Sequence, residues 1–332
     1  MRDFLSTGDY PSSELEAIVD LAFELKSGRI SGRPLSGKSI GLVFFNPSLR
    51  TRASMQAAIN DLGGYPITIE PGGTSWALEH RDGVIMDGSK SEHLKEFVRV
   101  LARYVSVIGV RTFAELKDWE TERTDPILRA FSEFSDAPVI NLESAMHHPC
   151  QAMADMMTIR EKAGSGRKRV LLTWAWHPKP LPMAVPNSFA LAAAQFGHDL
   201  TIANPKGFEL DDEILNRIET ESAQNGGSIS FCNDVEAAFD NAEIVYAKSW
   251  GAKEFYGNAE GDIHQRGPLR EKWIVDETKM SRTDDAIFMH CLPVRRNVVV
   301  TDAVLDSKHS VVIDQAENRL HIQKAILHRI LQ

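Results

Sequence analysis

The chain alternates short runs of β-branched and aromatic residues with amphipathic stretches over nearly its whole length. Residues 39–45 (SIGLVFF) form a continuous apolar run, as in a strand that is covered on both faces. Residues 53–62 have helical spacing and stop at Gly63 and Gly64. A strand, a polar turn and a helix, repeated many times, predict parallel sheets with crossover helices, so the expected fold class is α/β.

The pattern occurs in two series, which indicates two α/β domains of similar size, 1–147 and 148–332. The expected strands are 39–45, 66–70, 105–111 and 138–142, then 168–176, 198–204, 228–231, 243–247, 286–291 and 310–315. The expected helices between them are 53–62, 92–104, 125–135, 149–162, 184–196, 211–224 and 234–240. A first helix follows the capping-box pattern of Ser13 and Glu16, and a last helix begins at Glu317. The glycine-rich stretch 251–272 predicts a long surface loop.

The overall charge excludes several classes of protein. The 332 residues carry a formal net charge of −9 and no long basic run, so a general binder of nucleic acid or anionic membranes is not expected. Any anion must be held by a local basic pocket. No apolar run approaches the about 20 residues that cross a bilayer, and the start lacks a signal-peptide core, so we expect a cytoplasmic protein. Three cysteines without a C-x-x-C pair fit a reducing compartment.

Residues 46–52 (NPSLRTR) lie between the first expected strand and its helix. The carboxyl end of a parallel strand is where such sheets bind ligands, and a helix N-terminus offers free N–H groups to an anion. Ser48 and Thr51 add hydroxyls, and Arg50 and Arg52 add charged donors that suit phosphate. The segment therefore predicts a phosphate site. The alternative is an ordinary helix start with solvated arginines.

Two histidine-containing segments also follow expected strands, at 147–151 (HHPCQ) and 290–293 (HCLP). Histidine and cysteine are the usual zinc ligands, but the closely spaced ligand pairs of zinc sites are absent, so we expect no metal. Each segment alone fits a loop start with satisfied polar groups. Their placement at strand ends in both domains favours a cleft between the domains.

Four motifs in this order, S-x-R-T-R at 48–52, H-P-x-Q at 148–151, H-C-L-P at 290–293 and E-N-R at 317–319, resemble the aspartate/ornithine carbamoyltransferase family. The resemblance spans nearly the whole chain. It implies a carbamoyl-phosphate domain, then an amino-acid domain, and a final helix, 317–331, that packs back on the first domain. It also implies a homotrimer with active sites at the subunit boundaries.

The resemblance assigns roles residue by residue. Contacts to carbamoyl phosphate would come from Ser48, Leu49, Arg50, Thr51, Trp76, Arg111, His148, Gln151, Cys291, Leu292 and Arg319. The catalytic residues would be Arg111, His148, Cys291 and Arg319, and Trp76 would be contributed by a neighbouring subunit. A neutral amine attacks the carbamoyl carbon, so the developing oxyanion needs fixed donors, here Arg111, His148 and Thr51. The chemistry needs no metal and no redox cofactor.

The second domain separates this chain from ordinary ornithine carbamoyltransferases. Lys248, in YAKSWG, suits a carboxylate and gives a free α-ammonium no partner. The segments WAWHPKPLP, 174–182, and HCLPVRRN, 290–297, resemble the branch that acts on N-acylated ornithine, in which the proline-rich loop is part of a knot. The residues that match its acylornithine pocket are Trp76, Ser91, Glu143, His177, Lys248 and Arg295.

The acyl group is the finest distinction. The position of Ser91 is acidic in acetyl-type relatives and proline in succinyl-type ones, and an acid would repel a succinyl carboxylate whereas serine would not. The acetyl type also has a lysine where this chain has Val299. We therefore favour N-succinylornithine, with N-acetylornithine as the alternative, which the segment 317–326 resembles more.

Other functions are weaker matches. A catalytically silent paralogue should have lost a phosphate arginine or the H-P-x-Q motif, and neither is lost. A Rossmann dehydrogenase should carry G-x-G-x-x-G after its first strand, where this chain has NPSLRTR. Plain ornithine as the acceptor is disfavoured by Lys248.

Overall fold

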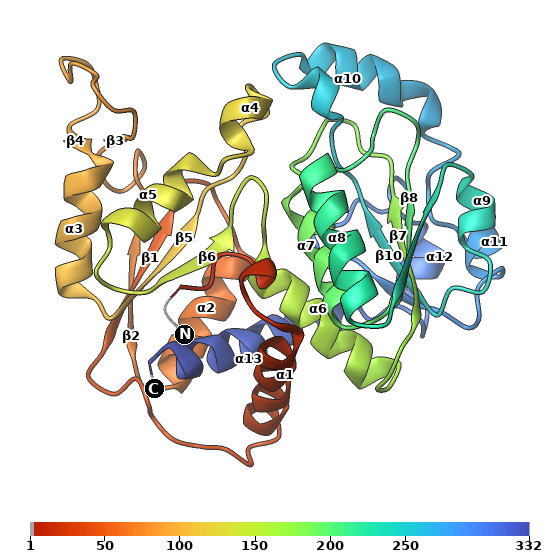
Figure 1. Ribbon diagram of the computed structural model, residues 1–332, viewed down its shortest axis with the longest axis horizontal. Coiled ribbons are helices and arrows are strands. Elements are labelled where there is room, and N and C mark those ends of the chain that lie inside the picture. Colours follow the sequence, from red (N-terminus) through yellow and green to blue (C-terminus); the bar gives the residue numbers. More distant parts are fainter. Residues whose placement is uncertain (1–2, 332) are drawn as a thin grey trace.

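The computed structural model describes residues 3–331, arranged as two α/β units side by side (Figure 1). The first has a four-stranded parallel sheet in the order β2-β1-β5-β6. Its strands are β1 (Ser39–Phe44), β2 (Tyr65–Ile69), β5 (Val107–Arg111) and β6 (Val139–Glu143). The second has a five-stranded parallel sheet in the order β11-β10-β7-β8-β9. Its strands are β7 (Arg169–Trp174), β8 (Asp199–Ala203), β9 (Ser228–Cys232), β10 (Ile244–Lys248) and β11 (Ile287–Met289). The expected α/β fold class is confirmed.

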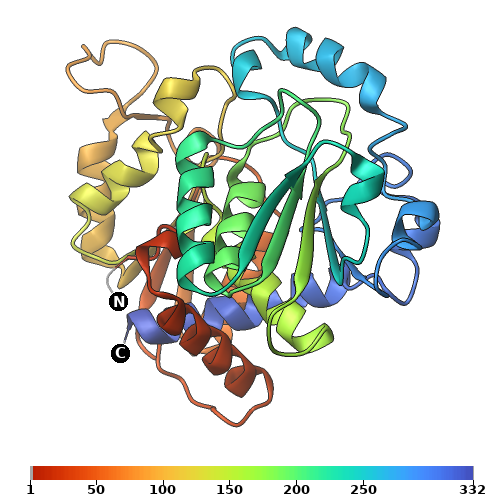
Figure 2. The same ribbon diagram turned by 45° about the vertical axis from the view of Figure 1, so that its right-hand side comes forward.

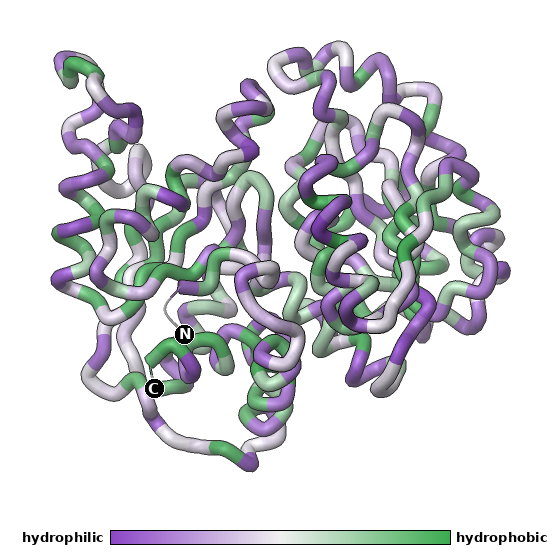
Figure 3. The backbone as a smooth tube through the Cα atoms, in the orientation of Figure 1, coloured by the Kyte–Doolittle hydropathy of each residue, from purple (hydrophilic) through white to green (hydrophobic). Residues whose placement is uncertain are grey.

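Helices cover both faces of the first sheet. On β1, Ile40 and Leu42 join one hydrophobic core and Val43 joins another, as expected of a strand that is buried on both sides. The helices are α1 (Ser12–Lys26), α2 (Arg50–Asp61), α3 (Leu94–Tyr104), α4 (Trp119–Glu122) and α5 (Pro126–Phe134), with a short 3-10 turn at Thr7–Asp9. Hydrophobic and hydrophilic segments alternate along α3 (Figure 3), because its apolar face packs inward and the rest faces solvent.

An excursion of the chain between β2 and α3 projects from the first domain (Figure 1). It contains two short paired strands, β3 (Leu78–Glu79) and β4 (Glu92–His93). The loop between these strands is mostly exposed. This excursion carries Trp76 and Ser91, and both residues are exposed.

Helix α6 (Pro149–Lys162) connects the two domains and belongs to both of their cores. Met153 and Met157 pack in the first core, whereas Ala152 and Met156 pack in the second. The remaining helices are α7 (Ala184–Gln195), α8 (Asp212–Gln224), α9 (Val235–Ala238), α10 (Ala259–Arg266), α11 (Glu277–Met280), α12 (Asp302–Leu305) and α13 (Val312–Ile330), with 3-10 turns at Lys253–Phe255 and Gly267–Leu269.

Helix α13 returns from the second domain to the first (Figure 2). It packs against α1, α2 and α6. Its residues Ile322, Ile326 and Leu327 are fully buried in the same core as β1. The last helix therefore completes the hydrophobic core of the first domain.

Three local expectations are wrong. Residues 310–315 are not a strand: Ser310 forms only an isolated bridge with Phe288, and α13 begins at Val312, five residues before the expected start. A short apolar run does not distinguish a strand from a buried helix start. The stretch 251–272 contains α10, which Asp262 and Arg266 fix through a buried ion pair. The capping box belongs to Ser6 and Asp9, and α1 has Pro11 at its N-cap.

The predicted domain ranges include residues 1, 2 and 332, which lie outside the described residues. Within residues 3–331 no helix is both long enough and apolar enough to cross a membrane. The proline-rich segment connects β7 to α7, and Gly251 donates to the carbonyl of Leu181 at 2.9 Å. The knot in this segment stays a prediction.

Candidate active site

A cavity of about 600 Å³ lies where the two domains meet. Its walls come from the segments that follow the carboxyl ends of β1, β5, β6, β7, β10 and β11, which is where open α/β sheets bind ligands. The cavity is lined by ten of the residues expected to contact carbamoyl phosphate, Ser48, Leu49, Arg50, Thr51, Arg111, His148, Gln151, Cys291, Leu292 and Arg319. It is also lined by four expected acylornithine residues, Glu143, His177, Lys248 and Arg295.

The charge of this lining is opposite to that of the whole protein. Six cationic side chains face the cavity, from Arg50, Arg111, Lys179, Lys248, Arg295 and Arg319, against one carboxylate, from Glu143. The chain as a whole has a formal net charge of −9. Cations that are concentrated in a concave site raise the local affinity for anions. The cavity is therefore built to hold a ligand, or a pair of ligands, with several negative charges.

The first part of the cavity is the N-terminus of α2. The Ser48 hydroxyl accepts the backbone N–H of Thr51 at 3.2 Å, which orders the turn before the helix. Arg50 lines the cavity and has no ion-pair partner within residues 3–331. Arg52 points elsewhere: it pairs with Glu70 and lies over the ring of Phe44. The expectation that Arg52 contributes to the phosphate site is therefore not supported by its position.

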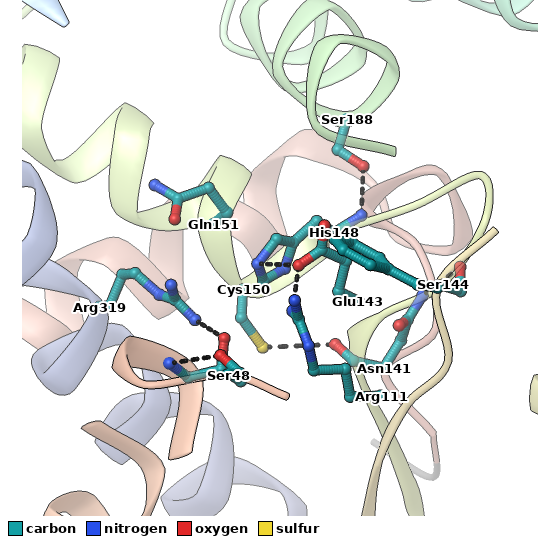
Figure 4. Close-up of polar contacts among 12 residues, drawn as sticks. Ser48, Arg111, Asn141, Glu143, Ser144, His148, Cys150, Gln151, Ser188 and Arg319 are labelled. Carbon is teal, nitrogen blue, oxygen red and sulfur yellow. Dashed lines mark hydrogen bonds and ion pairs between the residues drawn. The ribbon is translucent and has the colours of Figure 1, made fainter. Parts of the chain in front are cut away.

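The C-terminal helix α13 supplies Arg319 to the same region. Its guanidinium donates to the Thr51 hydroxyl at 2.6 Å, across 268 residues of sequence (Figure 4). The side chain is buried, and this burial lowers the pKa of Arg319. Within residues 3–331 this guanidinium has one hydrogen-bond partner, so an incoming anion would stabilise its buried charge.

Arg111, Glu143 and His148 meet on the opposite wall of the site (Figure 4). Arg111 forms an ion pair with Glu143, and the His148 Nε2 lies 3.4 Å from the same carboxylate. The His148 backbone N–H donates to the Ser188 hydroxyl at 2.7 Å, which holds the residue at the start of α6. Burial, with the nearby charges of Arg319, Arg111 and Lys248, keeps the pKa of His148 well below its usual value of 6.5, so the imidazole is neutral at pH 7.

Several buried polar atoms of these cavity-lining side chains have no hydrogen-bond partner within residues 3–331. Within residues 3–331, buried polar atoms without a hydrogen-bond partner include the Arg111 Nε, the His148 Nδ1, the Gln151 Oε1 and the Arg319 Nε. Buried polar groups without partners are uncommon because each one costs free energy. Two donors, one acceptor and one imidazole nitrogen in a single cavity fit a small polar ligand.

The second domain contributes a separate group of contacts. The Arg295 Nε donates to the His177 Nε2 at 3.0 Å, so the His177 Nδ1 carries the proton and donates to the carbonyl of Lys179 at 2.9 Å. Burial lowers the pKa of His177 to about 4. A neutral His177 and a charged Arg295 thus form one wall, close to Lys248.

The loop after β11 has an unusual backbone. Leu292 has φ of +55°, which is rare for a residue with a side chain and is found most often at functional sites. Its backbone N–H donates to the His290 Nδ1 at 2.9 Å. Cys291, between them, is buried, and this burial raises the pKa of its thiol, so Cys291 is uncharged at neutral pH.

Trp76 and Ser91 do not line the cavity of their own chain. Trp76 is 57% exposed, and its indole N–H donates to the Glu92 carboxylate at 2.7 Å. Ser91 is exposed and does not cap α3, because the His93 side chain accepts the N–H of Lys95 in that role.

Some lining residues were not expected, among them Phe113, Lys179, Leu181, Ser249 and His290. Lys179 lies within the segment 174–182 and His290 within 290–297, both described above. Their positions in these segments were the sequence evidence that could have identified them as lining residues. Phe113 and Leu181 carry no chemical signal in the sequence. They enter the cavity only because the loops after β5 and β7 face each other.

Comparison with known proteins agrees with this geometry. The model of the aspartate/ornithine carbamoyltransferase carbamoyl-P binding domain matches residues 2–161, and that of the Asp/Orn binding domain matches residues 183–330. An N-acetylornithine carbamoyltransferase of Xanthomonas campestris pv. campestris is 43% identical over 98% of this chain and 97% of its own. An N-succinylornithine carbamoyltransferase of Bacteroides thetaiotaomicron is 38% identical over 100% of this chain and 99% of its own.

Solved structures give the same result. A glutamate-to-serine variant of N-acetyl-L-ornithine transcarbamylase, complexed with carbamyl phosphate and N-succinyl-L-norvaline, has a TM-score of 0.96 at 44% identity. The match covers 99% of this chain and 100% of that one. With both family models matched in order and relatives alike over the full length, the chain belongs to the aspartate/ornithine carbamoyltransferase family and is a carbamoyltransferase.

Proposed function

We propose that the protein transfers the carbamoyl group of carbamoyl phosphate to the side-chain amine of an N-acylated L-ornithine, with N-succinylornithine as the favoured acceptor. The products are N-acylcitrulline and phosphate, and the reaction belongs to arginine biosynthesis in the cytoplasm. The observation that carries the proposal is the cavity itself, with six cations and one carboxylate between the two domains. Carbamoyl phosphate is an anion and the acceptor carries a carboxylate, and the relatives named above bear the names of N-acylornithine enzymes.

The phosphate end is assigned to the N-terminus of α2. Ser48, Leu49, Arg50 and Thr51 surround it, and Arg50 has no ion-pair partner in the part of the chain that the structure describes, residues 3–331. Free backbone N–H groups and the helix dipole favour an anion at this place. As the bond to carbamoyl carbon breaks, the leaving phosphate gains charge, and these donors stabilise it.

The carbamoyl end is assigned to the opposite wall. Arg111, His148 and Thr51 stabilise the oxyanion that forms when the amine attacks. Gln151 and Leu292 hold the NH₂ group, and Arg319 and Cys291 complete the surface around the reacting carbon. Arg111 pairs with Glu143 through one terminal nitrogen, which fixes the guanidinium at this wall.

The acceptor is assigned to the second-domain wall. Lys248 suits the α-carboxylate, and His177, Arg295 and Glu143 surround the acylated amide. The attacking amine must be deprotonated, and its pKa near ~10.4, by analogy with lysine, means that activity rises with pH through the neutral range.

The preference for succinyl depends on a position that is supplied in trans. We propose a homotrimer in which Trp76 and Ser91 of a neighbouring subunit reach the cavity, which fits the exposure of both residues and their absence from their own cavity. We infer that Ser91 takes the place of the glutamate that is replaced by serine in the variant complexed with N-succinyl-L-norvaline. Acetylornithine is the second candidate, because the relatives at 43% identity carry that name.

We propose a domain division at residues 147/148, into a carbamoyl-phosphate domain, 1–147, and an acylornithine domain, 148–332. β6 ends at Glu143 and α6 begins at Pro149, so the division falls in the connection between them.

One parallel assay tests the proposal. The protein is supplied with carbamoyl phosphate and, in separate reactions, with ornithine, N-acetylornithine or N-succinylornithine, and the citrulline-type product is quantified. We expect the largest kcat/KM with N-succinylornithine. Turnover of ornithine alone would contradict the N-acyl assignment, and a strong preference for N-acetylornithine would contradict only the succinyl assignment. Absence of product with all three would indicate a silent paralogue.

A further inference from the structure

Asp155 is the centre of a buried chain of hydrogen bonds that lies behind the cavity. Its Oδ1 accepts the side-chain NH₂ group of Gln151 at 2.7 Å and that of Gln315 at 2.7 Å. Asp155 and Gln315 are both 0% exposed, and neither lines the cavity. The three residues come from α6 and α13, so one carboxylate oxygen joins two helices at the site.

The chemistry of this oxygen determines how Gln151 is oriented. A side-chain amide has one donor end and one acceptor end of almost equal size, and an ionised carboxylate only accepts hydrogen bonds. Gln151 therefore turns its NH₂ toward Asp155, and its Oε1 is left without a hydrogen-bond partner within residues 3–331, in a side chain that lines the cavity. The carbamoyl group carries an NH₂ that requires such an acceptor.

The same oxygen also fixes the loop after β11. Gln315 must likewise turn its NH₂ toward Asp155, and its Oε1 then accepts the backbone N–H of His290 at 2.9 Å. The His290 Nδ1 accepts the N–H of Leu292, the residue with positive φ. A continuous path thus runs from Gln151 on the first-domain side to the 290–292 loop of the second domain.

The groups that face Asp155 keep this arrangement over the neutral pH range. Tyr246 of β10 interacts with both this carboxyl and the Cys291 thiol, and Arg319 of α13 is a cation whose charge acts on Asp155. Burial raises the pKa of Asp155 to about 7, against the hydrogen bonds of the two amides, which lower it. One carboxyl oxygen remains an acceptor even when the other binds a proton, so both amides keep their orientation.

We propose that Asp155 is a positioning residue, which presents the Gln151 Oε1 to the NH₂ group of carbamoyl phosphate and couples that contact to the 290–292 loop through Gln315. The inference rests on the proposed function only in that Gln151 meets the carbamoyl end of the donor. It predicts a defect that is specific to this end and leaves the phosphate end intact.

The test compares the affinity of the protein for carbamoyl phosphate with its affinity for inorganic phosphate, both by calorimetry, in the wild type and four variants. Asp155→Val removes both hydrogen bonds, Asp155→Asn keeps an acceptor oxygen, and Gln315→Met cuts the path on the loop side only. Thr158→Val is the matched control, because Thr158 is on α6 and also bonds α13, through Asn318 at 3.0 Å, but does not line the cavity.

We expect Asp155→Val to weaken carbamoyl phosphate binding and kcat/KM by about 10- to 100-fold, the range for a misplaced contact at a reacting group. Phosphate binding should change by less than about twofold, since uniform loss of the site would affect both ligands. Asp155→Asn should restore carbamoyl phosphate affinity to within about threefold of the wild type, because one amide oxygen can accept both NH₂ groups. Thr158→Val should leave both affinities unchanged.

Equal losses of phosphate and carbamoyl phosphate in Asp155→Val would overturn the inference, and so would an asparagine variant as impaired as the valine one. If the valine variant does not fold, Gln315→Met decides: it should lower kcat more than phosphate affinity, and an unchanged kcat would contradict the coupling. Both ligands belong to the donor half of the site. The result therefore stands whichever acylated or free ornithine proves to be the acceptor.

Discussion

Replacing Asp155 by asparagine is expected to stabilise the protein at alkaline pH and much less in acid. Burial raises the pKa of this carboxyl from 3.8 to about 7 in the folded state. Between these two values the folded protein retains a proton that the unfolded chain releases, so the stability of the wild type falls as the pH rises toward 7. Asparagine binds no proton and does not show this loss.

The magnitude follows from the two pKa values. They differ by about three pH units, and each unit corresponds to about 1.4 kcal/mol, so the full effect is roughly 4 kcal/mol. At pH 5 a part of that loss has already occurred. The difference in the free energy of unfolding between variant and wild type should therefore grow by roughly 3 kcal/mol between pH 5 and pH 8.

Urea unfolding at pH 5 and pH 8, at one protein concentration, measures this difference. The matched control is Thr158→Val on the same helix, α6, which removes a buried hydrogen bond to Asn318 but no titratable group. A fixed energetic cost of the amide itself would change the free energy of unfolding equally at both pH values. It would therefore not affect the difference between pH 5 and pH 8. A difference that stays constant from pH 5 to pH 8, or that shrinks, would refute the reasoning.

Three further outcomes are expected. Arg50→Ala should weaken carbamoyl phosphate binding by ~3 kcal/mol or more while unfolding is unchanged, because Arg50 carries ligand charge without packing in a core; an unchanged affinity in the folded variant would contradict the phosphate assignment. Mixing inactive Trp76→Ala and Arg50→Ala subunits should regenerate activity, since one shared site then carries neither change; mixtures that have exchanged subunits and stay inactive would indicate a site within one chain. Ser91→Glu should shift the ratio of kcat/KM values toward N-acetylornithine by about one to two orders of magnitude, because like charges at ~4 Å repel by ~4 kcal/mol at most; equal losses with both acceptors would argue against a role in acyl choice.

The parallel sheets could be predicted because their strands are continuous apolar runs that alternate with amphipathic helices. The sequence pattern did not predict the correct element where the contrast between apolar runs and amphipathic stretches is weak. Residues 310–315 are apolar enough for a strand but continue directly into α13, and α10 is short and rich in glycine and charge. Asp262 and Arg266 are four residues apart on this helix, and their ion pair becomes buried only when the helix packs against the rest of the second domain.

The residues that line the cavity could be predicted largely from motifs. The wrong expectation for Arg52 has a simple cause. Arg50 and Arg52 are two residues apart on one helix, so they point in different directions and cannot both face a ligand. The sequence analysis expected this helix to begin at residue 53 and placed both arginines in the turn before it, whereas α2 begins at Arg50. The link from Gln151 through Asp155 to Gln315 was not predictable, because it joins two helices that are 160 residues apart in the sequence.

The path of α13 has a consequence for the order in which the two domains fold during synthesis. Chains leave the ribosome from the N-terminus, and early domains generally fold first. Here the core around β1 lacks Ile322, Ile326 and Leu327 until the final helix has been synthesised. The second sheet, with all its strands between residues 169 and 289, is complete earlier. We therefore expect the second domain to fold first. The core of the first domain remains incomplete until the last helix has been synthesised.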